Sequence, residues 1–412
     1  MAVVRPFKAI RPTSELASKV AALPYDVMNS DEAREMVVGN PYSFLHVDKA
    51  EIDLDPSVDH YDRVVYEKAR DNLNQMIKDG VFIQDEKPCF YVYKQVMNGR
   101  AQIGIVGCAS IDDYMNNIIK KHELTRADKE QDRINHVDFC NANTGPIFLT
   151  YKSRSAINDI VAKTMEGAPV YDFTADGVQN TVWVITCPDC IKTISEEFAA
   201  TKYLYIADGH HRSASAVRVG KMRREQNPGY TGDEEFNFFL SVFFPDDQLY
   251  IMDYNRVVKD LNGMSDDEFM KKLATMFEVK EYAGEGQYRP VQKHQYGMYM
   301  NKKWYVLDAH DDIYDANDPV DRLDVSILQK NVLDPMLGIK DPRTDNRIDF
   351  IGGIRGLGEL ERRVNNGMKV AFAMFPTSID DLIDIADAGK IMPPKSTWFE
   401  PKLLSGLFVH QL

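Results

Sequence analysis

The sequence predicts an α+β protein of two domains. Its 412 residues exceed the size at which a single hydrophobic core usually stops growing, about 250–300 residues. Apolar runs typical of strands alternate with helical patterns in the first two thirds of the chain, and a new helix signal follows Asn262-Gly263. We therefore predict one domain over residues 1–262 and a second α+β domain over residues 263–412.

The composition excludes several classes of protein. Hydrophobic residues make up 44% and charged residues 27%, the balance of a folded globular chain. The net charge is −14, from 63 acidic and 49 basic residues, so the average surface repels a polyanion and nucleic acid is not an expected partner. No apolar run approaches the ~20 residues that span a bilayer. Five cysteines, few and odd in number, suit a reducing compartment. We expect a cytoplasmic protein without a membrane partner, and the sequence leaves its oligomeric state open.

The first element with a clear pattern is a helix. From about Asp59 to Asp79 the apolar residues follow helical spacing, and Gly80 is placed to end it. Two strand-like runs, CFYVYKQVM and RAQIGIVGCAS, then flank Asn98-Gly99. This dipeptide favours the positive φ angles of a two-residue hairpin turn, so a β-hairpin is predicted.

The middle of the chain predicts a strand, a sharp turn and a helix. In order, the expected elements are the strand TVWVIT, the helix IKTISEEF, the strand KYLYIA, the turn DGHH and the helix RSASAVRVGKMRR. The next two apolar runs, FNFFLSVFFP and QLYIMDYNRVV, are expected to extend the same sheet. Beyond residue 263 we expect a helix after a capping box at Ser265, a hairpin around Asn301, and helices near Asp324 to Leu337 and Ser378 to Ala388.

The turn after KYLYIA concentrates polar chemistry. Asp208 and Gly209 end a buried strand, and His210, His211 and Arg212 follow directly in the helix. The N-terminus of a helix favours anions, glycine lets the backbone approach a ligand closely, and arginine can bind two phosphate oxygens. We expect the three side chains to line one concave site around a common anion. The alternative is that the histidines only cap the helix or pair with Asp208.

The run IADGHHRSASA resembles the phosphate-binding turn of the free-serine kinases in the ParB/sulfiredoxin superfamily. Upstream, the segment from His122 to Thr125, a charged probable helix and the run Pro146-Ile-Phe-Leu149 resemble the order of elements in those kinases. The resemblance implies a ParB/sulfiredoxin-like mixed sheet with helices for the first domain. It also implies that Glu123 meets the turn although 85 residues separate it from Asp208.

The resemblance also implies roles for individual residues. Glu123 is the expected base toward an attacking hydroxyl; the alternative is that Glu123 is only an exposed charge beside Lys121. ATP or ADP with Mg²⁺ and a small-molecule substrate are the expected partners. The expected catalytic residues are Glu123, Asp208 and His211; the phosphate-binding residues are Gly209, His210, Arg212 and Ser213; the substrate-binding residues are His122, Thr125 and Arg133; and the metal ligand is Asp208.

Over nearly its whole length the chain resembles longer bacterial proteins of unknown function, some labelled as chromosome-partition regulators. The resemblance rests on Arg5-Pro6-Phe7 and Pro24-Tyr25-Asp26-Val27 near the start, His122-Glu123 and the DGHHR turn in the middle, and the run from Met392 to Lys402 near the end. Two functions follow from the two resemblances. The first is a nucleotide-dependent kinase of a small hydroxylated metabolite, with free L-serine preferred. The second is a nucleotide-binding regulatory or partition-type protein without turnover, against which the acidic charge and the lack of a clear helix-turn-helix count.

Three further motifs have competing interpretations. The glycine-rich stretch from Gly352 to Gly358 matches no nucleotide-loop spacing, so we predict a turn. The pair Cys187 and Cys190 has no second pair to complete a zinc site and is interpreted as chance. The segment from Lys395 to Lys402 offers cations that could close over phosphate, or it serves structure through Trp398 and Phe399.

Overall fold

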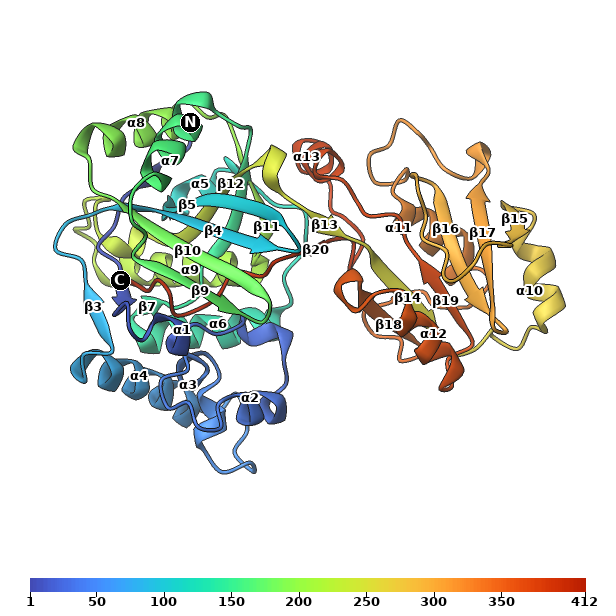
Figure 1. Ribbon diagram of the computed structural model, residues 1–412, viewed down its shortest axis with the longest axis horizontal. Coiled ribbons are helices and arrows are strands. Elements are labelled where there is room, and N and C mark those ends of the chain that lie inside the picture. Colours follow the sequence, from blue (N-terminus) through green and yellow to red (C-terminus); the bar gives the residue numbers. More distant parts are fainter. The chain divides into compact units, whose positions relative to one another are not determined.

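The computed structural model describes residues 1–412 and consists of two compact units (Figure 1). Unit 1 comprises Met1–Leu249 and Pro401–Leu412, and unit 2 comprises Tyr250–Glu400. Each unit combines helices with its own large sheet. The predicted α+β class is therefore confirmed. No helix combines the length and the apolar character needed to cross a membrane.

Unit 1 is built on a nine-stranded mixed sheet. Two neighbouring pairs, β6 with β11 and β8 with β12, run parallel, and the other pairs are antiparallel. The strands in spatial order are β6 (Ile119–Lys120), β11 (Leu204–Asp208), β8 (Ile147–Tyr151), β12 (Phe238–Pro245), β5 (Arg100–Ser110), β4 (Phe90–Met97), β10 (Val178–Ile185) and β9 (Tyr171–Ala175), with β1 (Val4–Arg5) paired to β5.

Helices bury the central strands of this sheet. Helices α7 (Ser155–Met165) and α8 (Pro188–Ala199) insert Ile157, Ile194 and Phe198 into one core with strand residues such as Leu149 and Phe243. Helices α6 (Ala127–Cys140) and α9 (His210–Gln226) pack on each other through Ile134, Val137 and Val219. The turn that opens α9 is thereby held between a buried strand and a packed helix.

The predicted local elements of unit 1 are present. Strands β4 and β5 form the hairpin, with positive φ at Asn98 (52°) and Gly99 (78°). Helix α4 (Arg63–Lys78) begins later than expected, because the side chain of Asp62 caps it by accepting from the amide of Val64. The remaining short elements of unit 1 are β2 (Ile10–Pro12), α1 (Ala17–Val20), α2 (Ser30–Met36), α3 (Leu45–Asp48), β3 (Phe82–Gln84), α5 (Ile111–Met115), β7 (Ala142–Asn143) and β21 (His410–Gln411).

Unit 2 has a six-stranded antiparallel sheet. The predicted capping box at Ser265 and the hairpin turn at Asn301 are both present. The sheet order is β15 (Phe277–Glu281), β17 (Lys303–Ala309), β16 (Gln295–Met300), β19 (Val370–Ala373), β14 (Tyr254–Val258) and β18 (Ile348–Gly352); the helices are α10 (Asp266–Leu273), α11 (Asp324–Leu328), α12 (Gly358–Asn365) and α13 (Ile379–Asp387), and β13 (Ile251–Met252) pairs with β20 (Trp398–Phe399).

One sheet prediction was wrong. The run QLYIMDYNRVV does not extend the sheet of β12, because its strand β14 pairs with β18 and β19 in unit 2. A 3₁₀ turn over Asp246–Gln248 interrupts the chain between the two runs, and an apolar pattern does not specify which partner a strand takes.

The division of the chain also differs from the expected boundary after residue 262. Asn262 and Gly263 form a positive-φ turn inside unit 2, leading into α10. The last residues, Pro401–Leu412, return to unit 1, where β21 pairs with β7. This return brings Lys402 to the turn at Asp208, which also lies in unit 1.

Candidate functional site

The turn between β11 and α9 has the geometry of an anion site. Gly209 has a φ of 96°, a conformation that side chains with a Cβ rarely adopt. Helix α9 then runs for 17 residues from His210. The first amides of such a helix have no partner within the helix, and its dipole is positive at this end. The strand, the tight turn and the helix are arranged as the sequence predicted.

Asp208, at the end of β11, is already surrounded by donors. One carboxylate oxygen accepts from the amide of Gly209 at 2.8 Å, and the other lies 3.1 Å from Nζ of Lys402 and 3.9 Å from Nη2 of Arg212. Burial alone would raise the pKa of Asp208, but the two cations outweigh it and hold the pKa well below its usual range. An ionised carboxylate between two cations is less available to the metal ion that we expected there.

Arg212 is largely buried against the turn. Its Nη1 donates to the carbonyl oxygen of Pro146, while its Nε has no hydrogen-bond partner in the chain. A Cβ added at Gly209 would lie 3.2 Å from the guanidinium carbon. The guanidinium therefore folds back over the glycine, where an anion at the start of α9 would also lie.

A pocket in unit 1 brings Arg212 and Arg133 together. Arg133 pairs with Asp132 at 2.8 Å, and its guanidinium lies over the ring of Tyr25, 4.0 Å from the ring centre. The pocket thus joins a residue expected to bind phosphate and one expected to bind substrate. Its lining residues are Pro24, Tyr25, Asp48, Arg133, His136, Val137, Asn143, Thr144, Gly145, Ile147, Arg212 and Ser405.

Sequence reasoning missed a buried polar cluster on this pocket. The hydroxyl of Thr144 donates to Asp48 at 2.7 Å, and Nε2 of His136 lies 3.1 Å from that hydroxyl and 3.5 Å from the carboxylate. Burial alone would lower the pKa of His136, but the Cys140 sulfur and Asp48 outweigh it and raise the pKa to about 9. Asp48 lies 96 residues from Thr144 in the sequence, so no local spacing could have indicated the cluster.

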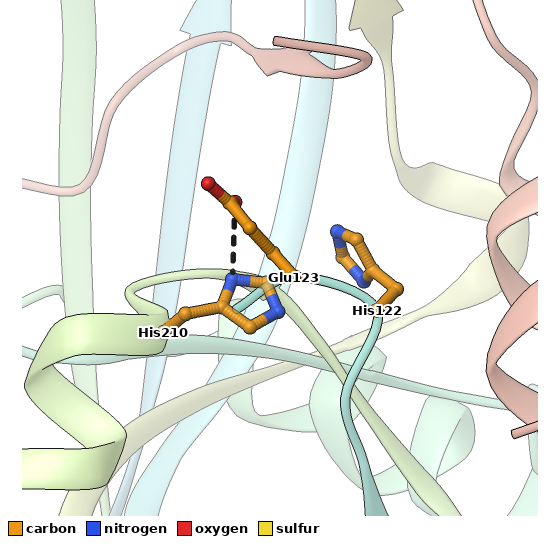
Figure 2. A group of neighbouring side chains, drawn as sticks. All are labelled: His122, Glu123 and His210. Atoms are coloured by element: carbon orange, nitrogen blue, oxygen red, sulfur yellow. Dashed lines mark ion pairs between the residues drawn. The ribbon is translucent and has the colours of Figure 1, made fainter. Parts of the chain in front are cut away.

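Glu123 reaches the turn in spite of its distance in sequence. Its Oε2 lies 3.6 Å from Nδ1 of His210, and the rings of His122 and His210 meet edge to face with centroids 4.5 Å apart (Figure 2). Burial lowers the pKa of His122 to about 4 and that of His210 well below its ordinary value. Two neutral imidazoles and a half-exposed carboxylate thus lie together on one side of the turn.

The remaining expected site residues point elsewhere. Nε2 of His211 accepts from the backbone amide of Arg126 at 3.1 Å, and the hydroxyl of Ser213 donates to the carbonyl of Gly209 within the helix at 3.0 Å. The hydroxyl of Thr125 donates to Glu130 at 2.7 Å. Burial lowers the pKa of His211, which matches its role as an acceptor.

The side chains of the turn therefore diverge. We expected His210, His211 and Arg212 to surround one anion, but His210 faces Glu123, His211 faces a backbone amide, and only Arg212 lines the pocket. The reason is the helix itself, since successive side chains on α9 are spread around its axis. The turn combines the N-terminus of a helix with a carboxylate on one flank and a pocket lined by Arg133 and Arg212 on the other.

Comparisons with known proteins match this sequence to one family. The model of the family described as "Protein of unknown function (DUF1015)" matches residues 4–326, more than half of the chain. No curated protein matches the sequence.

Several solved structures match the chain at low identity. A free serine kinase variant in complex with AMP is 14% identical, with a TM-score of 0.36 over 72% of this chain and 87% of that one. SbnI from Staphylococcus aureus, with a C-terminal truncation, is 11% identical, with a TM-score of 0.38 over 73% and 85%. A conserved hypothetical protein from Pyrococcus furiosus is 14% identical, with a TM-score of 0.35 over 76% and 97%.

Proposed function

The chain belongs to the DUF1015 family, and we propose for it the nucleotide-dependent transfer of a phosphoryl group to the hydroxyl of a small molecule, with free L-serine as the preferred acceptor. The observation that carries the proposal is the meeting of three features at one turn. These are the N-terminus of α9, the cations Arg212 and Lys402, and the carboxylate of Glu123.

The phosphates of ATP or ADP are assigned to the start of α9. Phosphoryl transfer depends mainly on positioning and on neutralising charge, and a helix N-terminus beside guanidinium groups supplies both. Arg212 has an unpartnered Nε, and Arg133 lies on the same pocket. Lys402 neutralises Asp208, which otherwise would repel a phosphate approaching the same amides.

Glu123 is the proposed base. In the transfer, the hydroxyl oxygen of the acceptor bonds to the terminal phosphorus, the bond to the bridging oxygen breaks, and the nucleotide leaves with one phosphate fewer. The hydroxyl proton passes to Glu123, whose half-exposed carboxylate stands beside the helix start. The neighbouring His210 is neutral, so it does not hold the carboxylate in a strong ion pair.

Mg²⁺ fits the site as an ion carried by the nucleotide. It prefers oxygen ligands and usually keeps several waters, with phosphate oxygens completing its shell. Asp208 is the oxygen donor that the sequence indicated, but its pairing with Lys402 and Arg212 makes the phosphates themselves the better ligands. When bound, the ion neutralises charge on the phosphates.

The test is direct. The full chain is incubated with Mg²⁺, with ATP or ADP in turn, and with a mixture of amino acids, and phosphorylated products are identified by mass spectrometry. The proposal expects a phosphorylated hydroxyl amino acid and consumption of one nucleotide. Nucleotide binding without any product, at every acceptor tried, would instead favour a regulatory nucleotide-binding protein.

A further inference from the structure

His122, Glu123 and His210 form a compact group of metal-ligating side chains (Figure 2). One ligand atom from each lies within 4.8 Å of the others, and Oε2 of Glu123 is 3.6 Å from Nδ1 of His210. Around a tetrahedral zinc ion with bonds of about 2.0–2.1 Å, neighbouring ligand atoms are about 3.4 Å apart. Small side-chain rotations would therefore bring the three groups to bonding distance.

The two imidazoles are buried without partners. His122 is 2% exposed and His210 is 6% exposed. Both ring nitrogens of His122 and Nε2 of His210 have no hydrogen-bond partner in the chain. A buried polar group without a hydrogen-bond partner destabilises the fold, and folded proteins rarely contain one. The nitrogens of His122 indicate a partner from outside the chain, while on His210 the nitrogen toward Glu123 is Nδ1 and the unpartnered one is Nε2.

The ligand set selects the class of ion. Imidazole nitrogen suits zinc and its transition-metal neighbours, whereas magnesium and calcium prefer oxygen. Two histidines and one carboxylate are a ligand set found in catalytic zinc sites, which keep one position open. We infer that His122, Glu123 and His210 bind one divalent transition-metal ion of the zinc class. This ion is separate from the Mg²⁺ carried by a nucleotide.

The inferred site has a consequence for the proposed transfer, although it does not depend on that transfer. A carboxylate bonded to a metal ion is a weaker base, because the ion withdraws electron density from it. Occupancy of the site would therefore slow transfer through Glu123. It would leave the pairing of Asp208 with Lys402 in place, because those groups are not among the ligands.

The experiment measures metal binding rather than activity. The full chain is treated with a chelator, dialysed against Zn²⁺ or Co²⁺ in the presence of excess Mg²⁺, and analysed for metal content and for the visible absorption of Co²⁺. The inference expects one ion per chain, retained against Mg²⁺, with the intense absorption of a low-coordinate cobalt site. A wild-type chain that retains no ion, or one whose ion Mg²⁺ displaces, overturns it.

Variants locate the ion. Glu123→Gln alters a half-exposed side chain and should leave the fold intact, while His122→Asn removes a buried ligand. Each is expected to lower the affinity for Zn²⁺ by more than ~10-fold, since even indirect supports of a metal site are worth 10–100-fold. His60→Asn, at an exposed histidine of the same unit, is the matched control and should bind as the wild type does. Unchanged binding by Glu123→Gln places the ion elsewhere and defeats the inference, whether or not the chain transfers phosphate.

Discussion

Two turns in this chain have the same plan and different surroundings. In unit 1, β11 ends at Asp208 and α9 begins after Gly209. In unit 2, β18 ends at Gly352 and α12 begins at Gly358 after a short 3₁₀ turn. Both run from a strand through glycine into a helix, the plan that suits anion binding. The first turn lies beside the buried imidazoles of His122 and His210, whereas the buried polar side chain at the second turn is the carboxylate of Asp253.

In unit 2, side chains of the chain itself occupy the space next to the turn. A Cβ at Gly353 would come within 2.5 Å of Asp253, so this glycine serves close packing. Arg355 is exposed, and the first turn of α12 carries Glu359, which pairs with Arg362 and Arg363 at 2.5 and 2.8 Å. A carboxylate at a helix N-terminus stabilises the helix and repels a second anion. A strand, a glycine and a helix start therefore define a possible anion site, while the side chains around them determine whether an anion can bind there.

The largest expected effect concerns Glu123. Glu123→Gln keeps the size of the side chain and removes the base, so turnover is expected to fall by ~10²–10⁴-fold while nucleotide binding is retained. Glu359→Gln, at the corresponding turn of unit 2, should leave turnover unchanged. Steady-state rates, measured with whichever acceptor the product assay identifies, test both variants. Equal rates for Glu123→Gln and the wild type would refute the assignment.

A smaller effect is expected from the glycines. Gly209→Ala and Gly356→Ala both place a Cβ at positive φ, 96° and 69°, and should each destabilise the fold by about 1–3 kcal/mol. Only Gly209→Ala also pushes on Arg212, so only this variant should lose nucleotide affinity. Denaturant unfolding and nucleotide titration of the two variants separate strain from binding. Equal affinity losses would mean that strain alone explains the effect.

A third expected effect is on stability with pH, and it differs between the units. In unit 1 the pKa of His136 is raised to about 9, so the stability it contributes is full below about pH 6.5 and is lost as the pH rises through 9. In unit 2, burial raises the pKa of Asp324 to about 7, so its contribution is full below about pH 4 and is lost as the pH rises through 7.

Thermal melting between pH 4 and pH 10 checks this difference. Asp324→Asn should flatten the lower part of the profile, and His136→Gln should flatten the upper part. Trp183 reports on unit 1, while Trp304 and Trp398 report on unit 2, so fluorescence of single-tryptophan variants assigns each loss. If neither substitution changes the dependence of the melting temperature on pH, these pKa shifts are contradicted.

The sequence was sufficient for elements that local chemistry specifies. Asn98-Gly99 specified a hairpin, the capping box at Ser265 specified a helix start, and the run through Gly209 specified strand, turn and helix. In each case the residues that determine the conformation are neighbours in the chain. The same reasoning interpreted the stretch from Gly352 to Gly358 as a turn without a nucleotide loop, and the structure has a 3₁₀ turn there.

Features that depend on distant partners were beyond the sequence. The pairing of Lys402 with Asp208 spans 194 residues, and Asp48 meets Thr144 across 96. The strand partner of β14 was assigned wrongly for the same reason. An apolar pattern indicates that a strand is buried, but it does not indicate which strand pairs with it. The direction of each side chain on α9 also depends on what packs beside it, which explains why His210, His211 and Arg212 were expected to converge and do not.

The central claim is that the turn at Asp208–Arg212 binds the phosphates of a nucleotide. It is tested most directly by calorimetric titration of ATP and ADP, with Mg²⁺, into the wild-type chain, Arg212→Ala and Arg355→Ala. Because a hydrogen bond to a charged group is worth about 1.5–3 kcal/mol, Arg212→Ala should weaken binding by ~10–100-fold, while Arg355→Ala should bind as the wild type does. A wild-type chain that binds neither nucleotide, or an Arg212→Ala variant of unchanged affinity, would contradict the account.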